Sequence, residues 1–311
     1  MMKRRVAKTV SVASLFRMFP TDQDAALWFE QVRWNGKPQC AHCQEAERIT
    51  VAKTKKYTYW CKACHKHFTA TTGTSLHGAK VPPVNWIVTM YLMTTARKGI
   101  SSLQLSKELG VTQKTAWFML HRVRAACRAG DFQLSNIVEV DETYIGGKAK
   151  NKHQNQKAKK IRGTEGKLAV FGIRQRGGKT FAKPVSGTDR NTLVPEIERR
   201  VESGSMICTD DSGTYRELDP QKYYHDSVRH SAGEYVKGFV HTNGMESVWA
   251  VLKRSLIGTY HHVSFKHLHR YVNEATFRLN DGNCDVDTMD RLCSMTRAIE
   301  GRRLSYKDLV Q

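Results

Sequence analysis

The apolar and polar positions between residues 241 and 256 predict a helix with one buried side. Apolar residues recur there at helical spacing, at Met245, Val248, Trp249, Leu252 and Leu256. Thr242 or Asn243 can cap the start of this helix. Glu246 and Lys253 share one side of it, about 10 Å apart along the axis, which is too far for an ordinary ion pair. Each of these two charges is therefore expected to have another partner.

Alternating apolar residues predict strands whose far parts carry acids. The strand that begins at Ile137 has Asp141 on its far part, before a glycine turn. A second short strand follows a predicted helix, as a parallel crossover strand would, and finishes at Asp210 and Asp211. Ligands gather at strand ends in such sheets. Two strand-end carboxylates and Glu246 can chelate two divalent ions for a phosphoryl displacement, although any one such acid is more often a turn residue.

Four of the eight cysteines form two Cys-x-x-Cys pairs: Cys40 with Cys43, and Cys61 with Cys64. The 17 residues between the pairs (61 − 43 − 1) lie within the spacing of a four-cysteine zinc ribbon. Four thiolates complete a tetrahedron at about 2.3 Å per sulfur and leave no open position, so the zinc is expected to be structural. Redox or chance pairs are the alternative. This cysteine usage suits a reducing cytosol better than a disulfide framework.

Residues 101–124 contain the helix-ending and helix-starting residues that are typical of a helix-turn-helix. A short helix is predicted to end at Gly110, and a second begins behind Thr112 as its cap. In that motif the start of the second helix meets base edges. The residues expected to contact DNA are Gln113, Lys114 and Thr115 at the bases, with Arg122 and Arg124 near phosphates. The alternative is an ordinary helical hairpin with solvated polar residues.

The net charge of the chain indicates which kinds of partner it binds. It has 50 Lys and Arg against 29 Asp and Glu among 311 residues, a net charge of +21. This excess predicts a polyanionic partner, with nucleic acid first and an acidic membrane surface second. The longest near-apolar run, residues 84–96, is too short for a span of about 20 residues, so no membrane insertion is expected. Residues 148–162 form a basic stretch expected to be a loop that contacts phosphates.

These motifs together resemble one family over nearly the whole chain. Trp34 leads into the ribbon cysteines, and further segments follow in order. They are Val140–Lys148, Thr209–Asp210 with Tyr215, His241–Asn243 with Glu246 and Trp249, Lys253–Arg254, Gly258–Ser264, and Tyr271–Glu274 with Phe277–Arg278 and Asn280. The chain resembles the DDE transposases of prokaryotic insertion sequences, in the branch with an N-terminal zinc ribbon, the insertion-sequence fifteen-ninety-five family.

The resemblance implies an α/β fold with a ribonuclease H-like core, a mixed five-stranded sheet with flanking helices. It implies metal-dependent cleavage and transfer of DNA strands, with Asp141, Asp210 and Glu246 as ligands of two Mg or Mn ions. Asp211 is an alternative to Asp210, and Asn243 an alternative third ligand. Lys253 matches the lysine that follows the third acid, and Lys253 and Arg254 are expected to hold DNA. The expected partners are the terminal inverted repeats and target DNA, bound by a homo-oligomer in the prokaryotic cytoplasm, associated with the nucleoid.

The expected domain order places the catalytic core near the end of the chain. It runs from a helical segment through the ribbon, the helix-turn-helix region and the core to a basic helical tail: residues 1–35, 36–79, 80–130, 131–285 and 286–311. Two other functions compete with the transposase. One is a domesticated DNA-binding regulator with an inactive core, and the other is a nuclease of the same ribonuclease H-like fold acting on junctions or RNA hybrids.

Overall fold

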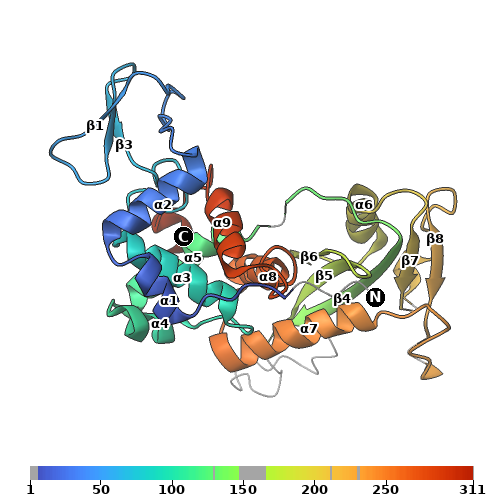
Figure 1. The fold of residues 1–311 in the computed structure, drawn as a ribbon. Helices are drawn as coiled ribbons and strands as arrows, with labels where there is room; N and C mark the ends of the chain where they lie inside the picture. Colours follow the sequence, from blue (N-terminus) through green and yellow to red (C-terminus); the bar gives the residue numbers. More distant parts are fainter. Residues whose placement is uncertain (1–5, 129, 147–165, 211, 230–231, 311) are drawn as a thin grey trace. The chain divides into compact units, whose positions relative to one another are not determined.

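The computed structural model describes residues 6–128, 130–146, 166–210, 212–229 and 232–310. The chain divides into two compact units, Met1–Arg128 with Asp281–Gln311, and Ala129–Asn280, and each is described by itself (Figure 1). The whole predicted basic loop at residues 148–162 lies outside the described residues, as does the alternative ligand Asp211.

The first unit is helical, with a small sheet in the ribbon. Its helices are α1 (Val12–Met18), α2 (Asp22–Trp34), α3 (Pro83–Thr95), α4 (Ser102–Leu109), α5 (Gln113–Ala126), α9 (Thr288–Ala298) and α10 (Lys307–Val310). Its strands are β1 (Ile49–Val51), β2 (Tyr59–Cys61) and β3 (Lys66–Phe68), which pair antiparallel in that order. α9 packs against α2, α3 and α5, so the end of the chain completes the core of this unit.

The second unit is built on a mixed sheet of five strands. Its strands are β4 (Ile137–Ile145), β5 (Leu168–Gln175), β6 (Thr180–Val185), β7 (Met206–Thr209) and β8 (Tyr224–Ser227). They lie in the order β6-β5-β4-β7-β8, antiparallel from β6 to β4 and parallel from β4 to β8. The helices are α6 (Arg190–Arg200), the 3-10 turn η3 (Gly213–Tyr215), α7 (Asn243–Ser255), the π-helical turn η5 (Leu256–Tyr260) and α8 (Phe265–Leu279). The predicted α/β class with a mixed sheet and flanking helices is confirmed.

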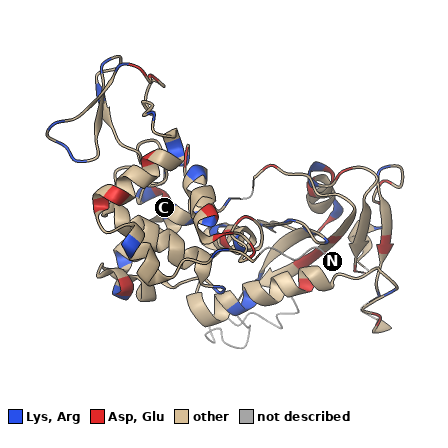
Figure 2. Cartoon of the chain, in the orientation of Figure 1, with Lys and Arg blue, Asp and Glu red and all other residues tan. Residues whose placement is uncertain are grey.

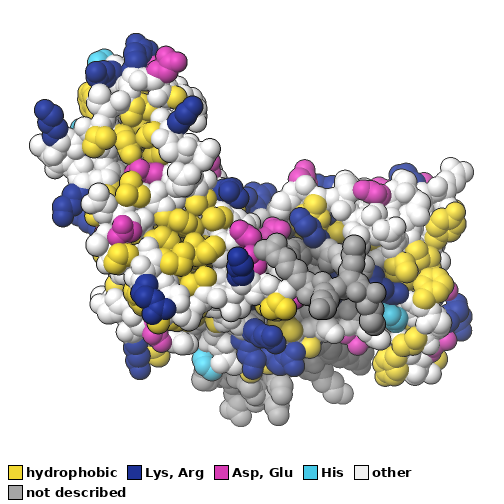
Figure 3. Space-filling view, viewed as in Figure 1, with side chains coloured by type: hydrophobic (Ala, Val, Ile, Leu, Met, Phe, Trp, Pro, Cys, Tyr) yellow, Lys and Arg dark blue, Asp and Glu magenta, His cyan; other side chains and the backbone are white. Residues whose placement is uncertain are grey.

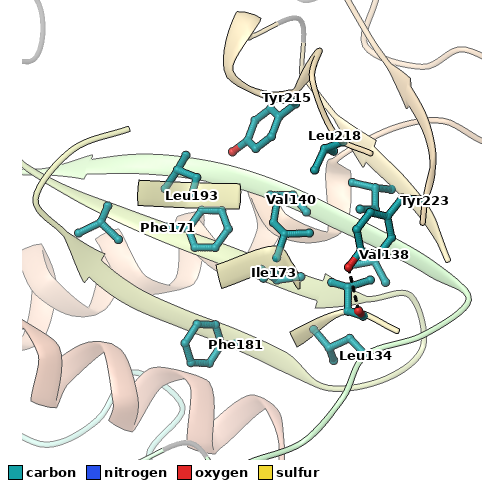
Figure 4. Packing of buried hydrophobic residues seen from close by; sticks show 14 of the residues in the cluster. Leu134, Val138, Val140, Phe171, Ile173, Phe181, Leu193, Tyr215, Leu218 and Tyr223 are labelled. Atoms are coloured by element: carbon teal, nitrogen blue, oxygen red, sulfur yellow. Dashed lines mark hydrogen bonds between the residues drawn. The ribbon is translucent and has the colours of Figure 1, made fainter. Parts of the chain in front are cut away.

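Two apolar layers cover the two faces of this sheet. Val138, Val140 and Phe171 pack with Leu193 and Ile197 of α6 on one face (Figure 4). The other face packs against the apolar stripes of α7 and α8. It comprises Val170, Ala182, Met245, Val248, Trp249, Leu252, Leu268, Tyr271 and Val272. Because side chains alternate along a strand, successive residues of β4 contribute to opposite layers.

β4 extends further than the sequence pattern suggested. Asp141 was expected near a strand end, but it lies in the middle of β4, which pairs with β5 from Val138 to Ile145. The strand-end position is wrong because pairing with β5 continues the strand past Asp141 to Ile145. The backbone stays paired with β5, and the acidic side chain points out of the ladder.

β8 is an outer strand of the sheet. Tyr224 on this strand is 70% exposed, and three apolar residues of the segment that follows, Tyr235, Val236 and Phe239, are more than half exposed. Apolar side chains accordingly reach the surface at this side of the second unit (Figure 3). Among the described residues, no helix is long and apolar enough to cross a membrane.

Candidate active site

Three separate elements carry the predicted acids. Asp141 lies on β4, Asp210 directly follows β7, and Glu246 lies in the first turn of α7. β4 and β7 are parallel neighbours with Glu139 opposite Cys208. Extending this register by two residues places Asp141 level with Asp210. The sheet thus brings two acids together that are far apart in sequence.

Asp141 lies in an environment that disfavours its negative charge. Trp249 Nε1 donates a hydrogen bond to its Oδ2 at 2.9 Å, and the backbone N–H of Glu142 donates to its Oδ1 at 2.8 Å. Even so, burial raises the pKa of Asp141 to about 6, and the charges of Asp210 and, more weakly, Glu246 add to the rise. Asp210 and Glu246 therefore lie close enough to Asp141 for their charges to act on it.

This donor set suits a hard divalent cation. Carboxylate oxygens are the ligands that Mg²⁺ and Mn²⁺ prefer, and mutually repelling carboxylates are stabilised by a cation. Within the described residues, the only group of three or more candidate ligands whose atoms all lie within 4.8 Å of one another is formed by cysteines. The three acids are therefore spaced more widely than a single shared ion would require.

A second acid of β4 lies on the opposite face of the sheet and was assigned no role from the sequence. Tyr215 is fully buried, and its hydroxyl donates a hydrogen bond to Oε1 of Glu142. Burial raises the pKa of Glu142 to about 7, the hydrogen bond from Tyr215 opposes this rise, and the charges of Asp210 and Asp141 add to it. Alternation along β4 could have separated Glu142 from Asp141, but the sequence does not reveal its partner.

The apolar stripe predicted for α7 is confirmed, since Met245, Val248, Trp249, Leu252 and Leu256 are all buried. A glycine allows the helix to lie this close to the sheet. Gly172 pairs with Asp141 across β4 and β5. A Cβ atom there would lie 2.3 Å from Met245 Cε and 2.5 Å from Trp249 Cη2. The missing side chain lets the indole lie close enough to the sheet to reach Asp141.

The start of α7 differs from the prediction. Thr242 occupies the N-cap position, but its side chain makes no capping hydrogen bond, and Asn243 is the first helical residue. The backbone N–H of Met245 instead donates to Oε2 of Glu139 at 3.0 Å. The sequence missed this cap because the acid comes from a distant strand, although it performs the same task of satisfying a free N–H.

The remaining predicted residues of α7 lie on its solvent side. Asn243, Glu246, Lys253 and Arg254 are all exposed. The acidic residue lies in the first turn of the helix, and the two basic residues lie in its last turn (Figure 2). Lys253 and Arg254 are therefore accessible to an anion.

The four ribbon cysteines meet as predicted. Their sulfur atoms all lie within 4.8 Å of one another, with Cys40 and Cys64 at 3.6 Å and Cys43 and Cys61 at 3.6 Å. A zinc–sulfur bond of about 2.3 Å gives an edge of about 3.8 Å in a regular tetrahedron. The sulfur positions fit a four-coordinate zinc, which supports a structural ion.

The predicted end of the first helix and cap of the second are present in α4 and α5. Gly110 ends α4 in the left-handed region at φ 64°, and the Thr112 side chain accepts a hydrogen bond from the N–H of Thr115 at 3.2 Å. Gln113 and Lys114 are exposed and Thr115 is half-buried. The ammonium of Lys114 lies 4.7 Å from the ring centroid of Tyr306, near the end of the chain.

Two arginines of α5 do not fit the expected phosphate contacts. Arg122 is 6% exposed and Arg124 is 2% exposed. The guanidinium of Arg122 lies 4.3 Å from the ring centroid of Phe118 in the same helix. Helical spacing placed these residues correctly on α5, but it could not show that other parts of the unit cover that side of the helix.

Two family matches give the class of protein, a transposase of an insertion sequence. Residues 133–280 match the ISXO2-like transposase domain, and residues 20–67 match the transposase zinc-ribbon domain. The chain belongs to the zinc-ribbon branch of the insertion-sequence transposases, which confirms the family indicated by its motifs.

Two curated relatives agree with this assignment. An uncharacterized protein in transposable element ISH50 of Halobacterium salinarum is 29% identical over 251 residues, covering 77% of this chain and 85% of the relative. An uncharacterized transposase-like protein of Haemophilus influenzae is 26% identical over 103 residues, covering 33% of this chain and 82% of the relative.

Two solved structures show only a distant likeness. One is a pre-cleavage Mos1 transpososome, with a TM-score of 0.27 at 12% identity over 70% of this chain and 80% of that chain. The other is a simian T-cell lymphotropic virus intasome in complex with PP2A regulatory subunit B56 gamma, with a TM-score of 0.28 at 14% identity over 62% of this chain and 65% of that chain. The assignment rests on the family matches.

Proposed function

We propose that the chain cleaves and transfers DNA strands, with Asp141, Asp210 and Glu246 as ligands of two Mg²⁺ or Mn²⁺ ions. The observation that carries this proposal is geometric: the register of β4 and β7 places Asp141 level with Asp210, and Trp249 bonds the helix that carries Glu246 to Asp141. A protein that only bound DNA would have no use for carboxylates gathered on a surface meant for a polyanion. Asn243 is the alternative third ligand.

Different residues of the chain have different roles in this reaction. Bound divalent ions would supply activation of the attacking oxygen and stabilisation of the leaving oxygen. Trp249 and the N–H of Glu142 hold the carboxylate of Asp141 in one orientation. Lys253 and Arg254, exposed toward the end of α7, hold the phosphates of the strand to be cut. Water attacks first and the freed 3′-hydroxyl second, so no covalent protein intermediate is required.

DNA recognition is assigned to the first unit and to the overall charge. Gln113, Lys114 and Thr115 at the start of α5 are proposed to contact the element ends, the terminal inverted repeats. The zinc ribbon contributes a second binding module, and target DNA and a second copy of the chain complete the assembly. With a net charge of +21, DNA affinity is expected to fall steeply with salt, because each neutralised phosphate releases counterion.

The test is a cleavage assay on DNA that carries the cognate element end. Glu246→Gln should lose about 10²-fold or more of the Mg²⁺-dependent cleavage rate while retaining DNA affinity. Glu202→Gln, which changes an exposed acid of the same unit, is the matched control. Cleavage by Glu246→Gln at the parental rate refutes Glu246 as ligand, and loss in Asn243→Ala instead would transfer the role to Asn243. Binding of element ends by the parent without nicking would favour a regulator, and cutting without need for element ends another nuclease.

A further inference from the structure

The two residues that flank Glu246 on the buried side of α7 both attach the helix to β4. The N–H of Met245 donates to Glu139, and one turn later the indole of Trp249 donates to Asp141. One turn of helix advances about 6 Å over four residues, and two strand residues advance about 6.7 Å. The two attachment points therefore match in spacing, and α7 lies along β4 with Glu246 between them.

Glu139 is held more tightly than an ordinary helix cap. It is 1% exposed, and its Oε1 accepts a hydrogen bond from Arg176 Nε at 3.0 Å while its Oε2 accepts from Met245. A Cβ atom on Gly244 would lie 2.5 Å from Oε2, so the glycine at the second helical position makes room for this carboxylate. Both carboxylate oxygens of Glu139 are therefore engaged within the protein, and its charge is compensated by Arg176.

Arg176 extends the attachment to the segment that leads into α7. Its Nη1 donates to the carbonyl of Phe239 at 2.8 Å, and its Nη2 donates to the carbonyl of His241 at 3.2 Å. Arg174, the cross-strand partner of Glu139, donates to the carbonyl of Gly244 at 2.9 Å. Hydrogen bonds from the sheet thus hold both the segment that leads into α7 and the first turn of α7.

We propose that Glu139 and Arg176 form a positioning pair that sets where Glu246 lies relative to Asp141. The pair does not touch the reacting atoms and acts through the start of α7. The inference rests on the proposed function, because it presumes that Glu246 binds a divalent ion with Asp141 and Asp210. It assigns a role to the acid two residues before Asp141, on the same side of β4.

The experiment uses the full-length, zinc-loaded protein and measures two quantities. The first is Mn²⁺ affinity, from the electron paramagnetic resonance signal of the free ion, and the second is cleavage rate against Mg²⁺ concentration. Glu139→Gln keeps the shape of the side chain and loses the ion pair. Arg176→Lys keeps the charge and loses the bonds to the two carbonyls. Glu196→Gln, which removes the ion pair with Lys183 on another part of the same sheet, is the control.

Glu139→Gln and Arg176→Lys should each weaken Mn²⁺ binding and raise the Mg²⁺ concentration for half-maximal cleavage by about tenfold or more, as loss of an outer partner of a metal site does. High Mg²⁺ should restore their cleavage but not that of Glu246→Gln. Element-end DNA affinity should stay within about twofold, because phosphate contacts dominate it, and Glu196→Gln should match the parent.

Parental metal dependence in Glu139→Gln would overturn the proposal, as would a loss that high Mg²⁺ does not restore, which would make Glu139 a ligand. If Glu139→Gln does not fold, Arg176→Lys decides by the same criteria. Failure of the proposed function is seen separately, because Glu246→Gln would then leave Mn²⁺ affinity unchanged. A fall in Mn²⁺ affinity for Glu246→Gln but for neither variant of the pair overturns the positioning role alone.

Discussion

The close approach of α7 to the sheet can be tested without changing any acid. In Gly172→Ala, the new Cβ atom would lie 2.3 Å from Met245 Cε and 2.5 Å and 2.6 Å from two atoms of the Trp249 ring. Carbon atoms in good contact lie about 3.5–4.0 Å apart, so α7 must withdraw by about 1 Å. That withdrawal lengthens the 2.9 Å bond from Trp249 to Asp141 and moves Glu246 with it.

Two contributions set the size of the effect. Extra volume in a packed core costs about 1–3 kcal/mol, and a lost hydrogen bond to a charged group costs about 1.5–3 kcal/mol. Together they give roughly 3–6 kcal/mol, within the stability of about 5–15 kcal/mol usual for a domain, so a folded but weakened protein is expected. A displacement of about 1 Å in a catalytic group can cost about 10²-fold in rate.

The assay compares Gly172→Ala with the parent by thermal melting and by single-turnover cleavage of element-end DNA. The melting temperature should fall by roughly 6–20 °C and the cleavage rate by about 10²-fold. Gly130→Ala is the control, because its Cβ atom would meet nothing within 4 Å. Parental stability and cleavage in Gly172→Ala would refute the argument that α7 must lie this close to β5.

Three further predictions concern protons, zinc and a helix cap. Burial raises the pKa of Asp141 to about 6 and of Glu142 to about 7, so between about pH 4 and 7 the native protein binds more protons than the unfolded chain. Without divalent ions, the contribution of these groups to the free energy of unfolding is therefore full below about pH 4 and is lost as the pH rises to 7. Mg²⁺ should reduce that loss. Urea titrations that show the same pH profile with and without Mg²⁺ would contradict this prediction. Removal of zinc by a chelator should abolish hydrogen-exchange protection in residues 36–70 alone, and an unchanged ribbon would exclude a structural ion. Thr112→Ala should lower the stability of the first unit by about 1 kcal/mol in urea, since it removes the acceptor for the N–H of Thr115, and an unchanged midpoint would rule out this cap.

Features encoded by local spacing were predictable from the sequence. The stripe of α7 follows from helical periodicity, and the caps of α4 and α5 follow from Gly110 and Thr112, whose effects reach only a few residues along the chain. The ribbon follows from two short cysteine spacings that bring their own ligands together. In each case the deciding interaction is local or is supplied by a repeated motif.

Features decided by a distant partner were not predictable. The middle position of Asp141 depends on pairing with β5, and the cap of α7 depends on Glu139, more than 100 residues earlier. The burial of Arg122 depends on parts of the unit that no helical pattern reveals. Likewise, the association of Asp281–Gln311 with the N-terminal helices has no local signal. Composition and periodicity specify which residues are buried, but not what covers them.

Glu139 and Asp141 are two carboxylates of one strand that lie in different electrostatic environments. Both are carboxylates on the same side of β4, because two residues separate equivalent positions in a strand. Glu139 has a cationic partner in Arg176, so its charge is compensated within the protein. Asp141 accepts hydrogen bonds from an indole and a backbone amide, both neutral, and it faces the charges of two further acids. The protein thus compensates the charge of Glu139, which holds α7 in place, whereas the charge of Asp141 is left for a divalent cation in the reaction we propose.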